Sequence, residues 1–335
     1  MQSTDMDGQD SSGETLKAIA YERLSSYLQE HEDHVCEIEV LPPAVQPPDG
    51  VLIHDGLNLG VPKKILVLAY VEARRRFLHH KDRSHSSLEA LQATKVMLLF
   101  DSEHLTAVNY RKRWLVRMRA FGMSEQKLLF RELNFLNSIL TSPLHRQTKS
   151  PTLWHHRLWI LDSLWTVGFE KASLDQKATF WRAELAAVCK SGERHPKNYY
   201  AWQYARRLVP RLTHDDKEDF ADVVRDWCFK HPSDISGWSF LLVLLPEIHS
   251  ETKALDILMH VIKYAIRLQA EQESLWIFIR TAAVRNVTQK EYLEACALLQ
   301  DQDKKQYAER TGFTPRWATL RDQFLHLRDR SVNSV

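Results

Sequence analysis

The stretch from Pro151 to Leu161 reads PTLWHHRLWIL and decides the fold. Trp154 and the residues three, four and seven positions after it fall on one face of an α-helix. Those residues are Arg157, Leu158 and Leu161. A large aromatic side chain in such a stripe is first of all a packing residue, because aromatics dominate core energetics. The stretch therefore predicts a helix whose buried face begins at the tryptophan.

Four other stretches align with this one, which indicates an internal repeat. They read TAVNYRKRWL, NYYAWQYARRLV, SGWSFLLVLL and ESLWIFIRTAA. The aligned anchor positions of the five repeats are Val108, Trp154, Trp202, Trp238 and Trp276. Successive anchors lie 46, 48, 36 and 38 residues apart, and each spacing accommodates two helices with their turns. We predict an all-α fold, a right-handed superhelix (α/α solenoid) of helical hairpins.

The composition of successive segments predicts four regions. Residues 1–15 are polar and are expected to form a disordered tail. Residues 16–60 are expected to form one helix and a connector without regular structure, because VLPPAVQPPDG holds four prolines. The five repeats occupy residues 61–287, and residues 288–335 are expected to form capping helices and a short tail. No strand is predicted anywhere.

Composition and charge exclude several classes of function. The 45 basic and 43 acidic side chains give a net charge of +2, so a nucleic-acid partner is not expected. Only 10 glycines are present, and no P-loop, GxGxxG or GxSxG motif occurs. His155 and His156 are adjacent and point to different helix faces, so no metal site is predicted. Four cysteines without a CxxC pair, a polar N-terminus and no long apolar run indicate a cytoplasmic protein without a transmembrane segment.

The third repeat carries a recognisable pattern. Asn198, Tyr199 and Trp202 form an N-Y-x-x-W sequence that resembles the repeat of protein prenyltransferase α subunits. That family has an arginine three residues after the tryptophan, and Arg111 and Arg157 occupy this position in the first two repeats. KSPTLWHHRLWIL at 149–161, NLGVPKKILVLAYV at 58–71 and TAVNYRKRWL at 106–115 are similar to a divergent branch, the protein prenyltransferase α-subunit repeat-containing proteins. The resemblance covers about residues 50–290.

The resemblance implies a function that this chain performs with a partner. In the family, an α subunit joins a zinc-containing β subunit, and the pair transfers a farnesyl or geranylgeranyl group from its diphosphate to a protein cysteine. It therefore implies a transferase that is inactive without a β subunit, with zinc held by that subunit and no cofactor in this chain. The other implied partners are an isoprenoid diphosphate and a cysteine-bearing protein.

The same resemblance implies roles for individual residues. Lys149, five residues before the second tryptophan, corresponds to a lysine that faces the diphosphate; without the resemblance it would be read as a solvated lysine at a helix start. Asn198 and Tyr199 correspond to residues near the subunit interface, or they support their loop. Thr152 replaces a glutamine that meets the substrate carboxylate in farnesyltransferase α subunits. The replacement argues against direct recognition of a C-terminal CaaX box in the protein substrate. It therefore favours geranylgeranyl transfer with a Rab-type β subunit.

A second function stays open at this point. Solenoids of helical hairpins also serve as scaffolds that bind other proteins through an extended surface. Because the repeats are degenerate, a non-catalytic scaffold or adaptor is the alternative to a prenyltransferase subunit.

Overall fold

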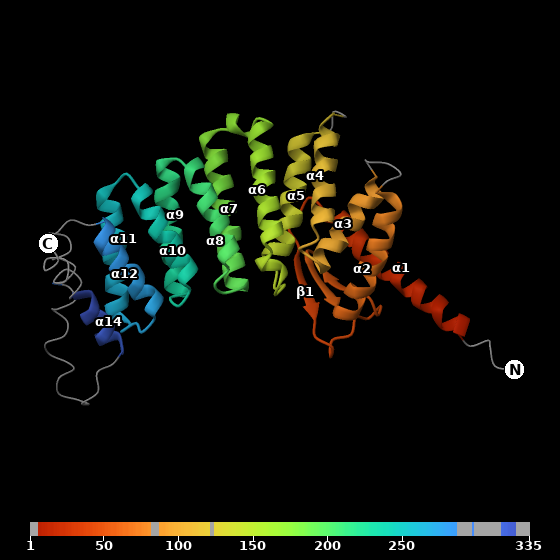
Figure 1. Cartoon of the computed structure of the whole chain (residues 1–335), viewed down its shortest axis with the longest axis horizontal. Coiled ribbons are helices and arrows are strands. Elements are labelled where there is room, and N and C mark those ends of the chain that lie inside the picture. Colours follow the sequence, from red (N-terminus) through yellow and green to blue (C-terminus); the bar gives the residue numbers. More distant parts are fainter. Residues whose placement is uncertain (1–5, 82–86, 121–123, 287–296, 298–315, 326–335) are drawn as a thin grey trace. The chain divides into compact units, whose positions relative to one another are not determined.

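A computed structural model describes residues 6–81, 87–120, 124–286, 297 and 316–325 of the chain. The described residues are almost entirely helical, with one small sheet (Figure 1). The predicted all-α class is therefore confirmed. The chain divides into two compact units, residues 1–177 with 186–204 and residues 178–185 with 205–335. No helix in the described part of the chain combines the length and apolar character needed to cross a membrane.

The first unit is a succession of helices, of which the first six each contact the next along the chain. Its helices are α1 (Met6–Glu30), α2 (Lys63–His80), α3 (Leu88–Phe100), α4 (Leu105–Ala120), α5 (Glu125–Leu140) and α6 (Pro151–Thr166). Two short 3₁₀ turns, η1 (Gln147–Lys149) and η2 (Phe169–Lys171), flank α6. Parts of α7 (Leu174–Arg194) and α8 (Tyr199–Leu208) complete the unit.

The second unit continues the same pattern of helices. Its described elements are η3 (Val209–Arg211), α9 (His214–Lys230), α10 (Ile235–Leu244), η4 (Leu245–Glu247), α11 (Glu251–Arg267), α12 (Glu273–Asn286) and α14 (Arg316–Leu325). Gly237 lets α10 approach α9 closely, because a Cβ atom there would lie 2.6 Å from the Trp227 ring. The helix α14 packs against α12, as a capping helix would. The rest of the predicted capping region lies outside the described residues.

The N-terminus differs from the expectation of a disordered tail over residues 1–15. The helix α1 begins at Met6, so that expectation is wrong from this residue onward, and residues 1–5 lie outside the described residues. The one helix expected within residues 16–60 is present, and it ends at Glu30. Its packing against α2 and α3 supplies a stable nucleus. Extension of an existing helix is cheap because each added residue gains one hydrogen bond without a new nucleation step.

The segment after α1 forms a three-stranded sheet, which contradicts the prediction of a connector without strands. The strands are β1 (Glu37–Leu41), β2 (Ile53–Asp55) and β3 (Asn58–Pro62), and β3 pairs in parallel with β1 and antiparallel with β2. The hydroxyls of Ser138 in α5 and of Ser142 just after it accept hydrogen bonds from the amides of Cys36 and Ile38, each at 2.8 Å. These side chains satisfy the outer edge of β1, which a local sequence pattern does not reveal.

The predicted anchors occupy the same place in five helices. Each is the fourth residue of its helix and is at most 3% exposed: Val108 in α4, Trp154 in α6, Trp202 in α8, Trp238 in α10 and Trp276 in α12. The indole N–H of three of them donates to the carbonyl oxygen six residues earlier: Trp154 to Thr148, Trp238 to Pro232 and Trp276 to Ala270, at 3.0, 2.9 and 2.7 Å. In these three repeats the tryptophan ring therefore packs in the core, and its N–H fixes the loop before the helix.

Candidate functional site

The candidate lysine lies in one of these loops. Lys149 is the last residue of η1, and Ser150 after it is the N-cap of α6, whose hydroxyl accepts from the amide of Leu153. Lys149 is half-buried, and within the described residues no carboxylate forms an ion pair with it. A cation beside a helix N-terminus is disfavoured by the helix macrodipole unless an anion lies nearby. The local structure is thus suited to an anionic ligand.

The loop before α6 lies beside the loop before α8, and we call residues 144–150 and 195–198 the loop pair. The carbonyl oxygen of Thr148 accepts from the Asn198 amide at 2.9 Å as well as from the indole of its own repeat. The rings of His145 and His195 contact each other, with centroids 5.3 Å apart. The structure therefore brings the candidate residues of the second and third repeats together.

Positive charge exceeds negative charge around the loop pair. Lys190 and Arg194, at the end of α7, both bind the Glu37 carboxylate of β1, at 3.0 and 2.6 Å. The hydrogen bond from Lys190 is the main reason that the pKa of Glu37 lies below its usual value. Arg146, like Lys149, forms no ion pair with a carboxylate of the described residues. These cations give the loop pair the electrostatics of an anion site.

Asn198 and Tyr199 have different surroundings. Asn198 is fully buried, its Oδ1 caps α8 by accepting from the Ala201 amide, and its Nδ2 also donates to the Ser191 hydroxyl at 3.0 Å. Tyr199 is 56% exposed and lies beside the ring of Tyr200. Asn198 therefore holds the loop in place, whereas Tyr199 offers a ring to a partner or substrate.

Thr152 is engaged with a carboxylate of the protein itself. It is the second residue of α6, and its hydroxyl donates to Glu103 in the loop before α4. The negative charge of Glu103 is favourable at this helix N-terminus. It would repel a substrate carboxylate at Thr152, which agrees with the expectation that this position does not read a C-terminal carboxylate.

The first family-type arginine belongs to a buried network. Arg111 in α4 is 2% exposed and binds both carboxylate oxygens of Glu132 in α5, and its Nη1 donates to Thr94 at 2.8 Å. His156 in α6 places Nε2 2.8 Å from the same carboxylate. Burial alone would raise the pKa of Glu132, but Arg111 and the His156 hydrogen bond hold it far below its usual value. The network ties α4 and α6 to α5.

The second arginine plays a similar part, and the partners of both were not foreseen. Arg157 is fully buried, and its Nη1 donates to the Asn137 side chain of α5 at 2.6 Å. Glu132 has a recognisable signal, because it lies four residues from the buried Leu128 and Leu136 on α5. A carboxylate inside such an apolar stripe indicates a buried ion pair.

The His156 side chain gives a pH prediction. Burial, together with the nearby Arg111 and Lys112, lowers the pKa of His156 although Glu132 opposes the shift. The histidine is therefore neutral in the fold, while the unfolded chain binds a proton below about pH 6.5, so stability falls as pH decreases through this value. We expect His156→Gln to reduce the slope of unfolding free energy between pH 6.5 and 5 by about 1 kcal/mol per pH unit. Urea denaturation at several pH values measures this slope.

The neighbouring residue supplies the control for this prediction. His155 is exposed, which confirms that the two histidines face different sides of the helix. His155→Gln is expected to leave the slope unchanged, because the His155 side chain is exposed and makes no contact with the buried Arg111–Glu132 network. Equal slopes for wild type and His156→Gln would show that His156 is not held neutral.

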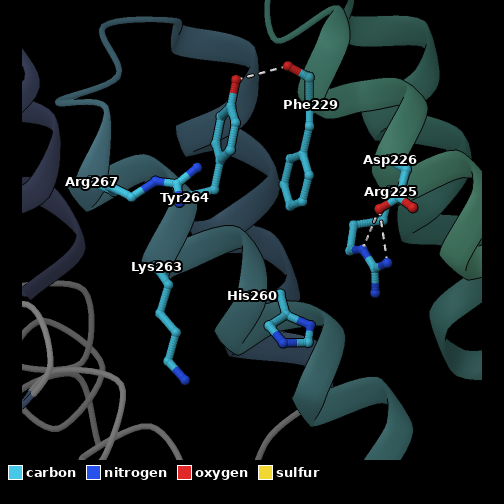
Figure 2. A pocket seen from close by; sticks show the side chains of 7 residues that line it. All are labelled: Arg225, Asp226, Phe229, His260, Lys263, Tyr264 and Arg267. Atoms are coloured by element: carbon cyan, nitrogen blue, oxygen red, sulfur yellow. Dashed lines mark hydrogen bonds and ion pairs between the residues drawn. The ribbon is translucent and has the colours of Figure 1, made fainter.

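The second unit has a pocket of about 370 Å³ between α9 and α11, which no sequence motif indicated (Figure 2). The rings of Phe229 and Tyr264 stack at one end of the pocket, with centroids 4.3 Å apart. His260, Lys263 and Arg267 of α11 also line it. Of these, Arg267 lies in the last turn of α11, where the helix macrodipole favours positive charge.

The described residues bring together no three His, Cys, Asp or Glu side chains that could hold a metal ion. The candidate site is the cationic loop pair, which is held by hydrogen bonds from the Trp154 and Asn198 side chains to the Thr148 carbonyl oxygen.

Comparisons with known proteins agree with the resemblance to prenyltransferase α subunits that was seen in the sequence. A family model described as the ECM9 middle domain matches residues 158–266. The chain is 24% identical over 243 residues to geranylgeranyl transferase type-2 subunit alpha of Saccharomyces cerevisiae, which covers 67% of this chain and 69% of that protein. It is 28% identical over 120 residues to Protein ECM9 of the same yeast, covering 35% and 29%. The Candida albicans geranylgeranyl transferase type-2 subunit alpha is 25% identical over 175 residues, covering 48% and 44%.

The similarity is low in identity but recurs among α subunits of one enzyme class. It supports a relationship to the prenyltransferase α subunits, as the repeat motif predicted. The chain spans about two thirds of the Saccharomyces subunit and less than half of the other two relatives. The assignment to the repeat-containing branch stays a prediction.

Proposed function

We propose that this chain is an α-type subunit of a heterodimeric protein prenyltransferase that transfers a geranylgeranyl group from its diphosphate to a protein cysteine. The observation that carries the proposal is Lys149, a half-buried cation without a carboxylate partner among the described residues, beside further positive charge in the loop pair. The similarity to type-2 α subunits supplies the reaction class. The cysteines of the described residues form no disulfide, which suits a reducing cytoplasm.

The reaction needs a cation where Lys149 lies. A thiolate attacks the first carbon of the isoprenoid, the carbon–oxygen bond breaks, and its electron pair leaves with the diphosphate. The negative charge that develops on this leaving group is stabilised by a positioned ammonium group in a site that excludes water. A zinc-containing β subunit would supply the metal that lowers the thiol pKa, since the described part of this chain offers no ligand set.

The contacts of Thr152 and Tyr199 support the finer assignment. Because Glu103 occupies the Thr152 hydroxyl, a substrate carboxylate has no partner there. This favours a Rab-type β subunit and an acceptor protein that docks through other surfaces. The exposed ring of Tyr199 is the candidate contact for the β subunit or the substrate.

The first test is assembly. We expect the chain to form a stable heterodimer when it is co-expressed with the Rab-type β subunit of its source, measured by size-exclusion chromatography and native mass spectrometry. Each other β-type subunit serves as a comparison. Failure to assemble with any β subunit would overturn the proposed enzyme.

The second test is the lysine itself. Lys149→Ala is expected to leave the heterodimer intact and to lower kcat about 10²–10³-fold, because the variant loses stabilisation of the leaving group. Lys171 is a matched control, because it also ends a 3₁₀ turn, is exposed, and lies outside the loop pair. Lys171→Ala should keep wild-type turnover in a geranylgeranyl transfer assay. Unchanged turnover in Lys149→Ala would refute the assigned role.

One observation favours a helical scaffold as the second candidate. The buried Arg111, Arg157 and Asn198 are all occupied by contacts within the fold. Repeat motifs that serve stability in this way persist without any catalytic role. A chain that binds other proteins but no β subunit would fit this alternative.

A further inference from the structure

The first unit contains a second site that the proposed function does not use. A cavity of about 220 Å³ lies among α1, α3, α4 and α5. Its apolar walls are formed by Leu88, Leu91, Trp114, Leu115 and Leu128. The charged groups that line it include Lys95, which comes from the buried face of α3. The cavity therefore places Lys95 beside a wall of leucine and tryptophan side chains.

The amine of Lys95 is buried and weakly bonded. Its side chain is 6% exposed, and within the described residues Nζ donates a long hydrogen bond to the Leu28 carbonyl oxygen, at 3.3 Å. The nearest carboxylate is that of Glu32, 3.7 Å away, and Arg131 binds the same carboxylate at 2.6 Å. Glu32 and Glu132 favour the ammonium form of Lys95, but burial and the charge of Arg111 outweigh them.

The surroundings also change the proton affinity of this amine. Burial, and then the positive charge of Arg111, lower the pKa of Lys95 to about 8. A lysine that is desolvated next to another cation is activated as a nucleophile, because its neutral form is populated near neutral pH. Burial also lowers the pKa of Lys112. Its amine lies over the Trp159 ring, however, and it does not line the cavity, so it is not placed to react with a ligand there.

We propose that Lys95 is a nucleophilic amine that takes small apolar aldehydes from this cavity as an imine. The nitrogen lone pair attacks the carbonyl carbon, and the carbonyl oxygen gains a proton to give a carbinolamine. The nitrogen gives up both of its protons, the oxygen leaves as water, and a carbon–nitrogen double bond remains. No oxidant or reductant is needed, and the inference does not depend on the proposed prenyl transfer.

The shape and charge of the cavity define the class of aldehyde. Its volume holds about seven groups of the size of a water molecule. Hexanal fits this limit and presents only hydrocarbon to the leucine and tryptophan walls. Glyoxylate is smaller and gains nothing from the apolar walls, and the two arginines that line the cavity are already paired with Glu132 and Glu32.

Reductive trapping tests the proposal on the full chain. The protein is incubated at pH 8 with low concentrations of hexanal and cyanoborohydride, which reduces the imine to a stable secondary amine, and peptide mass mapping locates the adduct. We expect Lys95 to be labelled about tenfold faster than Lys112 or the exposed Lys171, because only Lys95 among the three lines a cavity that can hold the hydrocarbon chain of hexanal. The labelling rate at Lys95 should be half-maximal at about pH 8.

Two controls separate the cavity from general reactivity. Lys95→Arg keeps a cation near Glu32 but has no nucleophilic amine, so a folded variant, checked by circular dichroism, should lose the fast phase of labelling. Glyoxylate in place of hexanal should label Lys95 no faster than Lys171. The proposal fails if hexanal labels the three lysines at similar rates, if folded wild type carries no adduct at Lys95, or if glyoxylate shows the same selectivity.

Discussion

Glu132→Gln is expected to lower the free energy of unfolding of the first unit by about 3–5 kcal/mol. The substitution keeps the side-chain volume but removes the charge that receives two N–H groups of Arg111, which stays charged and 2% exposed. An uncompensated buried charge is among the most costly defects in a protein interior. Urea denaturation at pH 7 measures the loss, and hydrogen exchange in α4 and α5 locates it.

Glu72 provides a matched control on another helix. It is also buried, but its partners Arg75 and Arg76 are 66% and 29% exposed, so water solvates them when the carboxylate is lost. Glu72→Gln should therefore cost only about 1 kcal/mol. The double variant Arg111→Met with Glu132→Leu should be less destabilised than Glu132→Gln, because both charges leave together. If the two glutamine variants are equally stable, the account of a stranded charge is wrong.

The sequence predicts those parts of the fold that depend on short-range periodicity. The positions of Trp154 and Trp238 within their helices follow from spacings of three, four and seven residues, which are properties of one helix. The strand β1 does not follow from such a pattern, because its partners β3 and α5 are distant in the chain. Proline-rich composition was misleading there: the prolines at 42–43 limit β1 and do not prevent it.

Some features of the candidate site likewise follow from the local sequence, and others depend on contacts between distant segments. Lys149 was identified through the family resemblance of the segment before Trp154, but the excess of positive charge around it depends on α7 and β1, which meet only in the folded chain. The capping role of Asn198 is a local property, since asparagine is a preferred N-cap residue. Its bond to Thr148 is not local, because fifty positions separate the two residues. Lys95 gave no sequence signal, since neither its burial nor its neighbours appear in the pattern of α3.

Trp154→Ala is the second substitution with a large expected effect, a loss of about 3–5 kcal/mol in the free energy of unfolding. The indole is 3% exposed and packs against the Tyr204 ring at a centroid distance of 5.2 Å. Its removal leaves a cavity between hairpins and also removes one of the hydrogen bonds that hold Thr148 in the loop pair. Urea denaturation followed by circular dichroism measures the loss.

Two milder substitutions separate packing from the hydrogen bond. Val108→Ala, at the same place in α4, removes two methyl groups and should cost about 2 kcal/mol. Trp154→Phe keeps most of the packing and should cost about 1 kcal/mol for the lost indole N–H, because the Thr148 carbonyl still accepts from Asn198. If Trp154→Phe were as damaging as Trp154→Ala, the hydrogen bond to the loop would be the main contribution of the anchor. In that case the anchor would act mainly by fixing the loop that carries Lys149, and its contribution to core packing would be the smaller one.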